Sequence, residues 1–180
     1  ICFIYSISNF FNTYSPRLTL KFYSSYLSTF VIEATNNTKI GAIKLQGQPW
    51  AIGVDEVRNR VYVADSHRTV SVIDGFTNAK LVHDIKVTGV AQDIAVDEAK
   101  NTVYVPNSDN GTVSIIAEYY DYIPLKFDLH NTRPSAIGIN QATGTVYVAN
   151  LENHTVSVLD SLLRKKYHTQ PDIEVGHRPN

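Results

Sequence analysis

The sequence predicts an all-β fold built from a repeated four-stranded unit of 42 to 43 residues. Two tripeptides, VYV and TVS, each occur three times, beginning at Val61, Val103 and Val146 and at Thr69, Thr112 and Thr155. The steps between copies are 42 and 43 residues for VYV, and 43 and 43 residues for TVS. Val, Ile, Thr and Tyr dominate these segments, and these residue types favour the pleated surface of a strand.

Each unit begins with an apolar run that we expect to form the first strand. These runs read AIGVD, DIAVD and AIGIN, and they span Ala51–Asp55, Asp93–Asp97 and Ala136–Asn140. A polar turn follows (EVRN, EAKN or QATG), and then come a strand around VYV, a variable tip and a strand around TVS. A looser fourth run closes the units, at Lys80–Val87, at Ile123–Leu129 and around Asp172–Val175.

The pattern of these runs favours sheets that are covered on both faces. A sheet with one wet face alternates apolar and polar residues, whereas VYV and the first runs are nearly continuously apolar. Radially stacked blades bury both faces in this way, so the unit is typical of a β-propeller blade. The prolines fit this arrangement, since edges and strand starts tolerate proline. Six of the seven prolines fall at such places. Pro124 and Pro171 lie in the outermost run, Pro49, Pro134 and Pro179 lie just before the first run, and Pro106 ends a second strand.

The opening of the chain departs from this pattern, because all nine glycines lie at Gly41 or later. From Val31 the register returns, and Val31–Leu45 parallels Val72–Val87. Projecting the repeat backward places strands at Phe10–Tyr14 and Leu20–Tyr23. We therefore expect a single, partial propeller of about four blades, with a degenerate first blade at 1–46, blades at 47–88, 89–131 and 132–175, and the start of another repeat at 176–180.

The number of repeats leaves two arrangements open. A propeller of this repeat size usually has more than four blades, although four is within the known range. We prefer a fragment of a six- to eight-bladed ring over a closed four-bladed ring. On this interpretation, the remaining blades or another copy are needed to close the ring.

Composition excludes several classes of function. The formal net charge of −1 provides no basic field for nucleic acid or anionic lipid. The single cysteine, Cys2, excludes an internal disulfide and a multi-cysteine zinc site. The apolar opening Ile1–Phe11 is too short for a spanning helix, so no transmembrane segment is expected.

At the repeat the chain resembles the YVTN family of β-propeller repeats, a relative of the NHL and WD-type (WD40) propellers. The family unit reads approximately PxGIAVxPxxxxVYVTNxxxxTVSVIDxxTxxVxxTIxVG, and Gln48–Val87 follows it nearly throughout. The resemblance extends over Val31–Asn180. The second residue after VYV is Asp65, Asn107 or Asn150, where the family has a uniform Asn.

The resemblance implies a surface, extracellular or periplasmic protein with a binding or scaffolding role. Related propellers include lactonases and gluconolactonase-like metal enzymes, so the fold alone does not decide the function. The chain itself contains no G-x-S-x-G elbow, no phosphate-binding glycine loop and no zincin motif. Its six histidines show no metal-ligand spacing, and His83, His130 and His168 are expected in solvent beside outer strands.

The candidate binding residues lie in the loops of one face. In a propeller, the tips of the middle hairpins and the inter-blade loops gather beside the central channel, and loops on a rigid scaffold often carry recognition residues. The tip Ser66–Arg68 and its counterparts differ from unit to unit, as a binding surface requires. The candidates are Gln48, Trp50, His67, Arg68, Gln92, Arg133, His154, His177 and Arg178. Ordinary solvated loops, with Trp50 packed between blades, are the alternative interpretation.

The recurring polar residue after VYV has two interpretations. Asp65, Asn107 and Asn150 could present a ring of oxygen ligands to a cation such as calcium. They could instead form Asx turns, in which the side chain accepts a hydrogen bond from the backbone two residues on. Recurrence once per unit favours the structural role, so no cofactor is expected, with calcium as the one candidate.

Three functions follow from these observations. The sequence favours a non-enzymatic module that binds a protein, peptide or glycan through its loop face. A hydrolase or lactonase-like enzyme with a metal in the channel is the first alternative, and it needs convergent ligands from different blades. A structural spacer in a cell-surface protein is the second. No catalytic residue and no metal ligand can be assigned.

Overall fold

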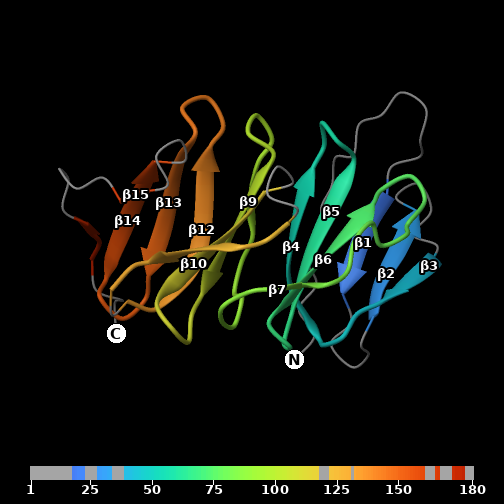
Figure 1. Cartoon of the computed structure of the whole chain (residues 1–180), viewed down its shortest axis with the longest axis horizontal. Coiled ribbons are helices and arrows are strands. Elements are labelled where there is room, and N and C mark those ends of the chain that lie inside the picture. Colours follow the sequence, from blue (N-terminus) through green and yellow to red (C-terminus); the bar gives the residue numbers. More distant parts are fainter. Residues whose placement is uncertain are drawn as a thin grey trace.

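The computed structural model describes residues 18–22, 28–33, 39–117, 122–130, 132–160, 165–166 and 172–176. All regular elements in these ranges are strands, and the strands form four antiparallel sheets. Figure 1 shows the four sheets standing side by side in chain order, with the first and the fourth at opposite ends of the row. The prediction of an all-β propeller fold with four-stranded blades is therefore confirmed.

The strands follow one another within each sheet in chain order. The first sheet contains β1 (Leu18–Phe22), β2 (Ser28–Glu33) and β3 (Lys39–Lys44). The second contains β4 (Pro49–Asp55), β5 (Arg60–Asp65), β6 (Thr69–Asp74) and β7 (Ile85–Lys86). The third contains β8 (Ala95–Asp97), β9 (Thr102–Asn107), β10 (Thr112–Ala117) and β11 (Leu125–Asp128). The fourth contains β12 (Pro134–Asn140), β13 (Thr145–Asn150), β14 (Thr155–Asp160) and β15 (Lys165–Lys166), and β16 (Ile173–Glu174) also pairs with β14.

The middle hairpins form where the two tripeptides predict them. VYV lies inside β5, β9 and β13, and TVS opens β6, β10 and β14. In the ladder of the second sheet, Val61 pairs with Ile73 and Val63 with Ser71. The same register recurs in the third sheet, where Val103 pairs with Ile116. The repeat in the sequence is therefore a repeat in strand pairing.

Three strands are shorter than the sequence predicts, since β11 spans only Leu125–Asp128 of the expected run Ile123–Leu129. In the third unit the expected strand Asp93–Asp97 begins only at Ala95. The carboxylate of Asp93 accepts hydrogen bonds from the N–H of Ile94 at 2.8 Å and from the N–H of Ile137, in the next sheet, at 3.0 Å. This side chain therefore ties the start of the run to the neighbouring sheet.

In the second unit, the expected outer strand Lys80–Val87 is reduced to β7. Lys80 makes an isolated bridge with Ile73, and its Nζ lies 2.7 Å from a carboxylate oxygen of Asp84. This ion pair joins the two ends of the short segment between the Lys80 bridge and β7.

The prolines lie close to their predicted places. Pro49 and Pro134 are the first residues of β4 and β12, rather than the last residues of a loop, and each is followed by a register shift in the ladder. Pro124 directly precedes β11, and Pro106 is the penultimate residue of β9. Pro171 and Pro179 lie outside the described residues.

The first unit is described in part. β1 overlaps the strand predicted at Leu20–Tyr23, and β2 and β3 complete a three-stranded sheet. The strand predicted at Phe10–Tyr14 lies outside the described residues.

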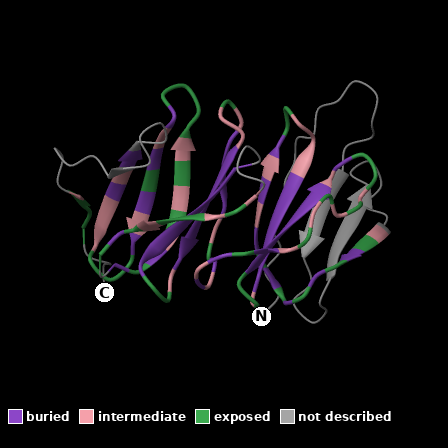
Figure 2. Ribbon diagram, in the orientation of Figure 1, coloured by how far each residue is buried: buried purple, intermediate pink, exposed green. Residues whose placement is uncertain are grey.

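The hydrophobic core lies between neighbouring sheets. Between the first and second sheets, Ile43 and Leu45 pack against Val61, Val63 and Ile73. Each buried side chain of this size stabilises the fold by about 1.5–3 kcal/mol. Figure 2 shows the resulting band of buried residues across the two middle sheets.

The two other layers of the core join the second sheet to the third and the third to the fourth. Tyr62 lies in the first of these layers with 1% of its surface exposed. Burial, aided by the nearby Tyr122 hydroxyl, raises the pKa of Tyr62 to about 12. Both faces of the second and third sheets are thus covered, as the apolar runs predict.

Among the described residues, no helix has the length and apolar character needed to cross a membrane.

Candidate functional site

The tips of the middle hairpins lie against the segments that connect one sheet to the next. The N–H of Ser66 donates to the carbonyl of Gln48, and the N–H of Leu151 donates to the carbonyl of Arg133, both at 2.9 Å. The N–H of Ser108 bonds to the carbonyl of Val90 in the same way, at 2.9 Å. These backbone bonds place both kinds of loop at one end of the strands, and we call this end the loop face.

The tips share one backbone conformation. Arg68, Gly111 and His154 occupy equivalent positions before the TVS strand and have φ angles of 60°, 65° and 54°. This left-handed conformation lets each tip reverse direction in a few residues. The tips thus share this one left-handed position, although the β5–β6 tip has three residues and the other two tips have four.

Beneath the tips lies a buried polar cluster. The side chain of Asp65 accepts hydrogen bonds from the N–H of His67 at 3.0 Å, of Thr69 at 3.2 Å and of Gly47 at 2.9 Å. The bond to the residue two positions on is the expected Asx turn. The turn therefore has the structural role that the sequence favoured for this position.

The two asparagines at the equivalent position are held by the TVS motif. Asn150 Nδ2 donates to the hydroxyls of Thr155 at 3.1 Å and Ser157 at 2.8 Å. The amide of Asn107 lies within 3.0 Å of the hydroxyls of Thr112 and Ser114. We assign its oxygen to these hydroxyls, because its nitrogen then donates to the Gly89 carbonyl at 3.2 Å. In the third and fourth sheets the hydroxyls of TVS thus satisfy this buried asparagine, whereas in the second sheet the Ser71 hydroxyl bonds to Asp84.

Most of the predicted binding residues lie in solvent on the loop face. Gln48, His67, Arg68, Gln92 and Arg133 are exposed, and His154 is half-buried. Trp50 is 38% exposed, at the register shift of β4 between Pro49 and Ala51. A shift of this kind re-aims a side chain out of the ladder. His177 and Arg178 lie outside the described residues.

The structure brings some of these residues together. The Ser66 hydroxyl accepts from the N–H of Gln48 at 3.0 Å and lies 3.5 Å from His67 Nδ1, so the Gln48 and His67 loops are joined. Arg68 reaches to the next sheet, where its guanidinium lies 2.8 Å from Asp109. The N–H of Gln92 donates to the carbonyl of Pro106 at 3.2 Å.

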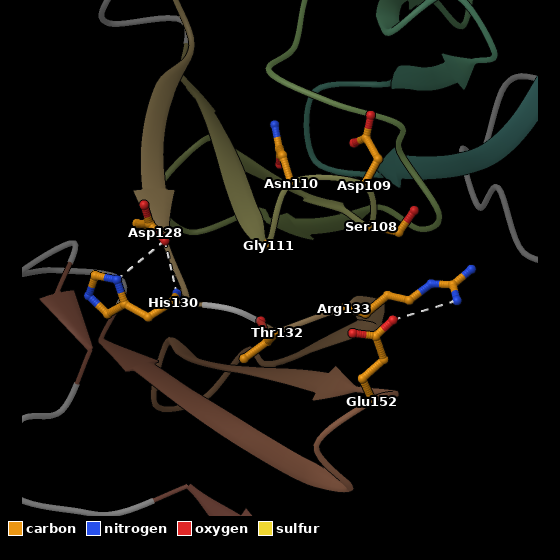
Figure 3. A pocket seen from close by; sticks show the side chains of 9 residues that line it. All are labelled: Ser108, Asp109, Asn110, Gly111, Asp128, His130, Thr132, Arg133 and Glu152. Carbon is orange, nitrogen blue, oxygen red and sulfur yellow. Dashed lines mark hydrogen bonds and ion pairs between the residues drawn. The ribbon is translucent and has the colours of Figure 1, made fainter.

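A hollow opens on the loop face between the third and fourth sheets. Its volume is about 560 Å³. It is lined by the β9–β10 tip, by the connection from β11 to β12 and by the β13–β14 tip, through Ser108, Asp109, Asn110, Gly111, Asp128, His130, Thr132, Arg133 and Glu152. Figure 3 shows the Ser108–Asn110 side chains on one side of the hollow and Arg133 and Glu152 on another. Of the predicted binding residues that the structure describes, only Arg133 lines it.

Ion pairs order the charged side chains around this hollow. Arg133 lies 3.9 Å from Glu152, and His130 Nδ1 lies 3.5 Å from Asp128. The N–H of His130 donates to Asp128 at 2.9 Å, and this bond lowers the pKa of the Asp128 carboxyl. The lining thus presents three carboxylates and one guanidinium. This arrangement offers a ligand several acceptor oxygens and, on the guanidinium, several N–H donors.

Only weak signals for the remaining lining residues are present in the sequence. Asp109 and Glu152 lie in the variable tips, the counterparts of Ser66–Arg68, which the sequence predicts as the binding surface. Asp128 and His130 lie at the end of an outer strand, where His130 was expected in solvent. Its side chain is indeed 83% exposed, and it stands at the rim of the hollow. What the sequence could not show is that this outer connection meets the neighbouring tips.

The part of the chain that the structure describes contains no group of three or more His, Cys, Asp or Glu side chains arranged to hold a metal ion. The carboxylates of Asp109, Asp128 and Glu152 are each engaged with a different cation, namely Arg68, Lys126 or Arg133.

Comparison with known proteins identifies the fold and leaves the family open. No family model matches the chain, and no curated protein matches it. Among solved structures, the chain is similar to Kuenenia stuttgartiensis hydrazine synthase, with a TM-score of 0.73 and 18% sequence identity. The match covers 84% of this chain and 45% of that chain. At this identity the likeness shows the propeller fold alone, and the chain spans less than half of its structural relative.

Proposed function

We propose that this chain is a non-enzymatic propeller module of the YVTN type that binds a protein, peptide or glycan through its loop face. The observation that carries the proposal is the hollow between the third and fourth sheets. Its lining comes from positions that differ between repeats, whereas the strands beneath it repeat almost residue for residue. Variable loops on a constant scaffold are the usual arrangement of a recognition surface.

The polar groups of the hollow support binding rather than turnover. The Ser108 hydroxyl bonds to the Val90 carbonyl at 3.4 Å, whereas the His130 imidazole pairs with Asp128. A nucleophile and its base have to lie within hydrogen-bond reach of one another. Among the described residues no hydrogen bond joins the Ser108 hydroxyl to the His130 imidazole, so this pair lacks the contact that activates a nucleophile.

The family resemblance supports the same proposal and an extracellular or cell-surface setting. Hydroxyl and amide groups of a glycan or peptide match the carboxylates and the guanidinium that line the hollow. The buried side chains of Asn107 and Asn150 tie the two tips at the hollow to the hydroxyls of TVS, and a preordered loop lowers the entropic cost of binding.

The test is binding of the purified chain to glycan and peptide arrays, followed by titration of the strongest probe. We expect Arg133→Ala and Glu152→Gln each to weaken that affinity about tenfold, with an unchanged melting temperature. Glu56→Gln is the matched control, because Glu56 is exposed in the β4–β5 turn at the opposite end of the strands. Wild-type affinity in both pocket variants would contradict the proposal.

Calorimetry with calcium separates this function from that of a metal-dependent hydrolase. Such an enzyme would release or absorb heat on calcium addition and melt at a higher temperature. We expect the binding module to retain its array ligand in the presence of a chelator.

A further inference from the structure

One side chain crosses the loop face between the second and third sheets. Arg68, the last residue of the β5–β6 tip, places its guanidinium 2.8 Å from a carboxylate oxygen of Asp109 in the β9–β10 tip. The other oxygen of Asp109 accepts a hydrogen bond from the N–H of Val90 at 2.7 Å. Both oxygens of this carboxylate are therefore satisfied, one of them by an arginine of the preceding tip.

The corresponding positions between the third and fourth sheets lack the arginine. Gly111 is the counterpart of Arg68, because both residues directly precede the TVS strand, with φ angles of 65° and 60°. Glu152 is the counterpart of Asp109, because each is the second residue of its tip. The third and fourth sheets thus keep the carboxylate of this junction, whereas the arginine is replaced by a residue without a side chain.

The hollow occupies the place that corresponds to the Arg68–Asp109 pair. Gly111 and Glu152 both line it. Among the described residues, Glu152 pairs with Arg133 alone, at a distance of 3.9 Å, and both side chains are more than half exposed. That distance exceeds a hydrogen bond, and an exposed ion pair of this kind contributes little. The carboxylate is thus open to a stronger partner that enters the hollow.

A second carboxylate borders the same space. One oxygen of Asp128 accepts a hydrogen bond from the N–H of His130 at 2.9 Å, and the other lies 3.8 Å from Lys126 Nζ. Figure 3 shows Asp128 and Glu152 on two sides of the hollow, with Thr132 between them. A cation in the hollow therefore has an incompletely paired carboxylate on either side.

Thr132 adds a hydrogen-bonding group that the earlier junctions lack. Gly47 and Gly89 hold its position in the two preceding repeats. Thr132 is 7% exposed, and its Oγ1 has no hydrogen-bond partner in the part of the chain that the structure describes. Figure 3 shows this oxygen turned toward the open space. Because a buried hydroxyl without a partner is unfavourable, a donor that reaches Thr132 from the hollow would be favoured.

We propose that the hollow takes a guanidinium group, supplied by an arginine side chain in an exposed peptide segment of a partner protein. This assignment rests on the proposed function and selects one of the ligand classes named there. The guanidinium of the ligand lies between Asp128 and Glu152 and donates to them and to the Thr132 hydroxyl. It thereby takes the place that Arg68 has at the preceding junction.

The chemistry of the lining favours arginine over the other candidates. A guanidinium has five N–H donors in a planar fork, so it can serve two carboxylates and a hydroxyl at once. The ammonium group of lysine is a compact point charge, and a sugar hydroxyl brings no charge to the carboxylates. Arg133 keeps a role in the complex, because its guanidinium donates to the main-chain carbonyls of the peptide.

The test is calorimetric titration of the full chain with a capped Gly-Gly-Arg-Gly-Gly peptide. Two matched peptides replace the arginine with citrulline, its uncharged isostere, or with lysine. We expect the citrulline peptide to bind about tenfold more weakly than the arginine peptide, with the lysine peptide between them. Glu152→Gln should narrow the difference between the arginine and citrulline peptides.

Gly111→Arg tests the correspondence between the two junctions. The variant supplies the missing guanidinium from the chain itself, and the backbone accepts it because Arg68 has the same conformation. We expect it to weaken binding of the arginine peptide about tenfold. Gly144→Arg is the matched control, since Gly144 has a φ angle of 69° in the β12–β13 turn at the opposite end of the strands, where Asn59 and Asn101 stand in the other repeats. It should keep the affinity within about twofold, because distant exposed charges are screened.

Equal affinities for the arginine and citrulline peptides, or no binding of the arginine peptide, would overturn the inference. So would unchanged binding by a Gly111→Arg variant that melts normally by circular dichroism, and if this variant does not fold, the peptide comparison decides. In each case the proposed function stands as long as the array ligand loses affinity in Arg133→Ala and Glu152→Gln. Wild-type affinity of those two variants for the array ligand is the separate result that contradicts the proposed function.

Discussion

The role of a single side chain in this protein depends on the side chains that surround it in its sheet. Asp84 is an example, because its carboxylate lies 2.7 Å from Lys80 Nζ and accepts a hydrogen bond from Ser71 at 2.5 Å. Burial by itself would raise the pKa of Asp84, but the hydrogen bonds from Lys80 and Ser71 outweigh it and lower the pKa. The ionised form is thus the form that the folded state prefers.

This shift predicts how stability depends on pH. A carboxyl whose pKa is lower in the folded state stabilises the fold above its unfolded pKa, and the contribution is lost as the pH falls through the folded pKa. We expect Asp84→Asn to lower the free energy of unfolding at pH 7 by about 1.5 kcal/mol. The variant should also lose less stability than the wild type between about pH 5 and pH 2. Urea unfolding at a series of pH values measures both effects, and parallel pH curves would contradict the assignment.

Much of this residue-level pattern can be read in the sequence. The Asx turn at Asp65 was expected from its recurrence, and Asn59, Asn101 and Gly144 indeed turn the chain with φ angles of 52°, 50° and 69°. The Asp128–His130 pair was not predicted, because it depends on where an outer connection meets its neighbours. A sequence pattern reports burial and turn preference, whereas such a contact is set by the packing of whole sheets.

At the scale of elements, the middle hairpin is the best-determined part of each sheet. The tripeptides locate both of its strands, and the tip between them needs a residue in the left-handed conformation. The third sheet places Gly111 there, whereas the others use Arg68 and His154. Each non-glycine residue in this conformation costs roughly 1–2 kcal/mol.

The left-handed conformation of Gly111 in the third sheet therefore makes stability sensitive to the residue type at this position. We expect Gly111→Ala to lower the free energy of unfolding by about 1 kcal/mol, since alanine adopts a φ of 65° only at a cost. Gly111→Asn should lose less, because asparagine tolerates this conformation. Denaturant unfolding of the two variants compares them, and a larger loss for Asn than for Ala would contradict the explanation.

Elements outside the hairpins follow the sequence less closely. The first strand of the third sheet begins at Ala95 rather than Asp93, because the Asp93 carboxylate accepts a hydrogen bond from the N–H of Ile137. The outer strand of the second sheet is limited to the two residues of β7. Outer strands pair on one side, so side-chain contacts such as Lys80–Asp84 compete with the ladder there. The sequence predicts the existence of these strands better than their ends.

At the scale of the whole molecule, the same residue has different surroundings in different sheets. Gly53 and Gly138 occupy one position of the repeat, in AIGVD and AIGIN, yet only Gly53 faces a neighbouring sheet. No sequence pattern separates the two, because the difference lies in what stands beside the sheet. The exposure of the fourth sheet beside Gly138 can therefore be found only from the structure.

The pair provides a test of sheet packing with its own control. We expect Gly53→Ala to lower the free energy of unfolding by about 1–3 kcal/mol, because the new methyl group would press on Ile94 and Val96. Gly138→Ala should change it by less than about 0.5 kcal/mol. Thermal and urea unfolding of both variants give the comparison, and equal losses at the two positions would show that packing between sheets is not the cause.

The layered core also has a consequence for how the molecule opens. Each layer joins only two neighbouring sheets, so a sheet can detach at the cost of the layers it shares. Among the described layers, the first and fourth sheets share one each, whereas the second and third share two each. Partial unfolding therefore begins at the two outer sheets, and the backbone amides of β5, β6, β9 and β10 are the last to become accessible to solvent.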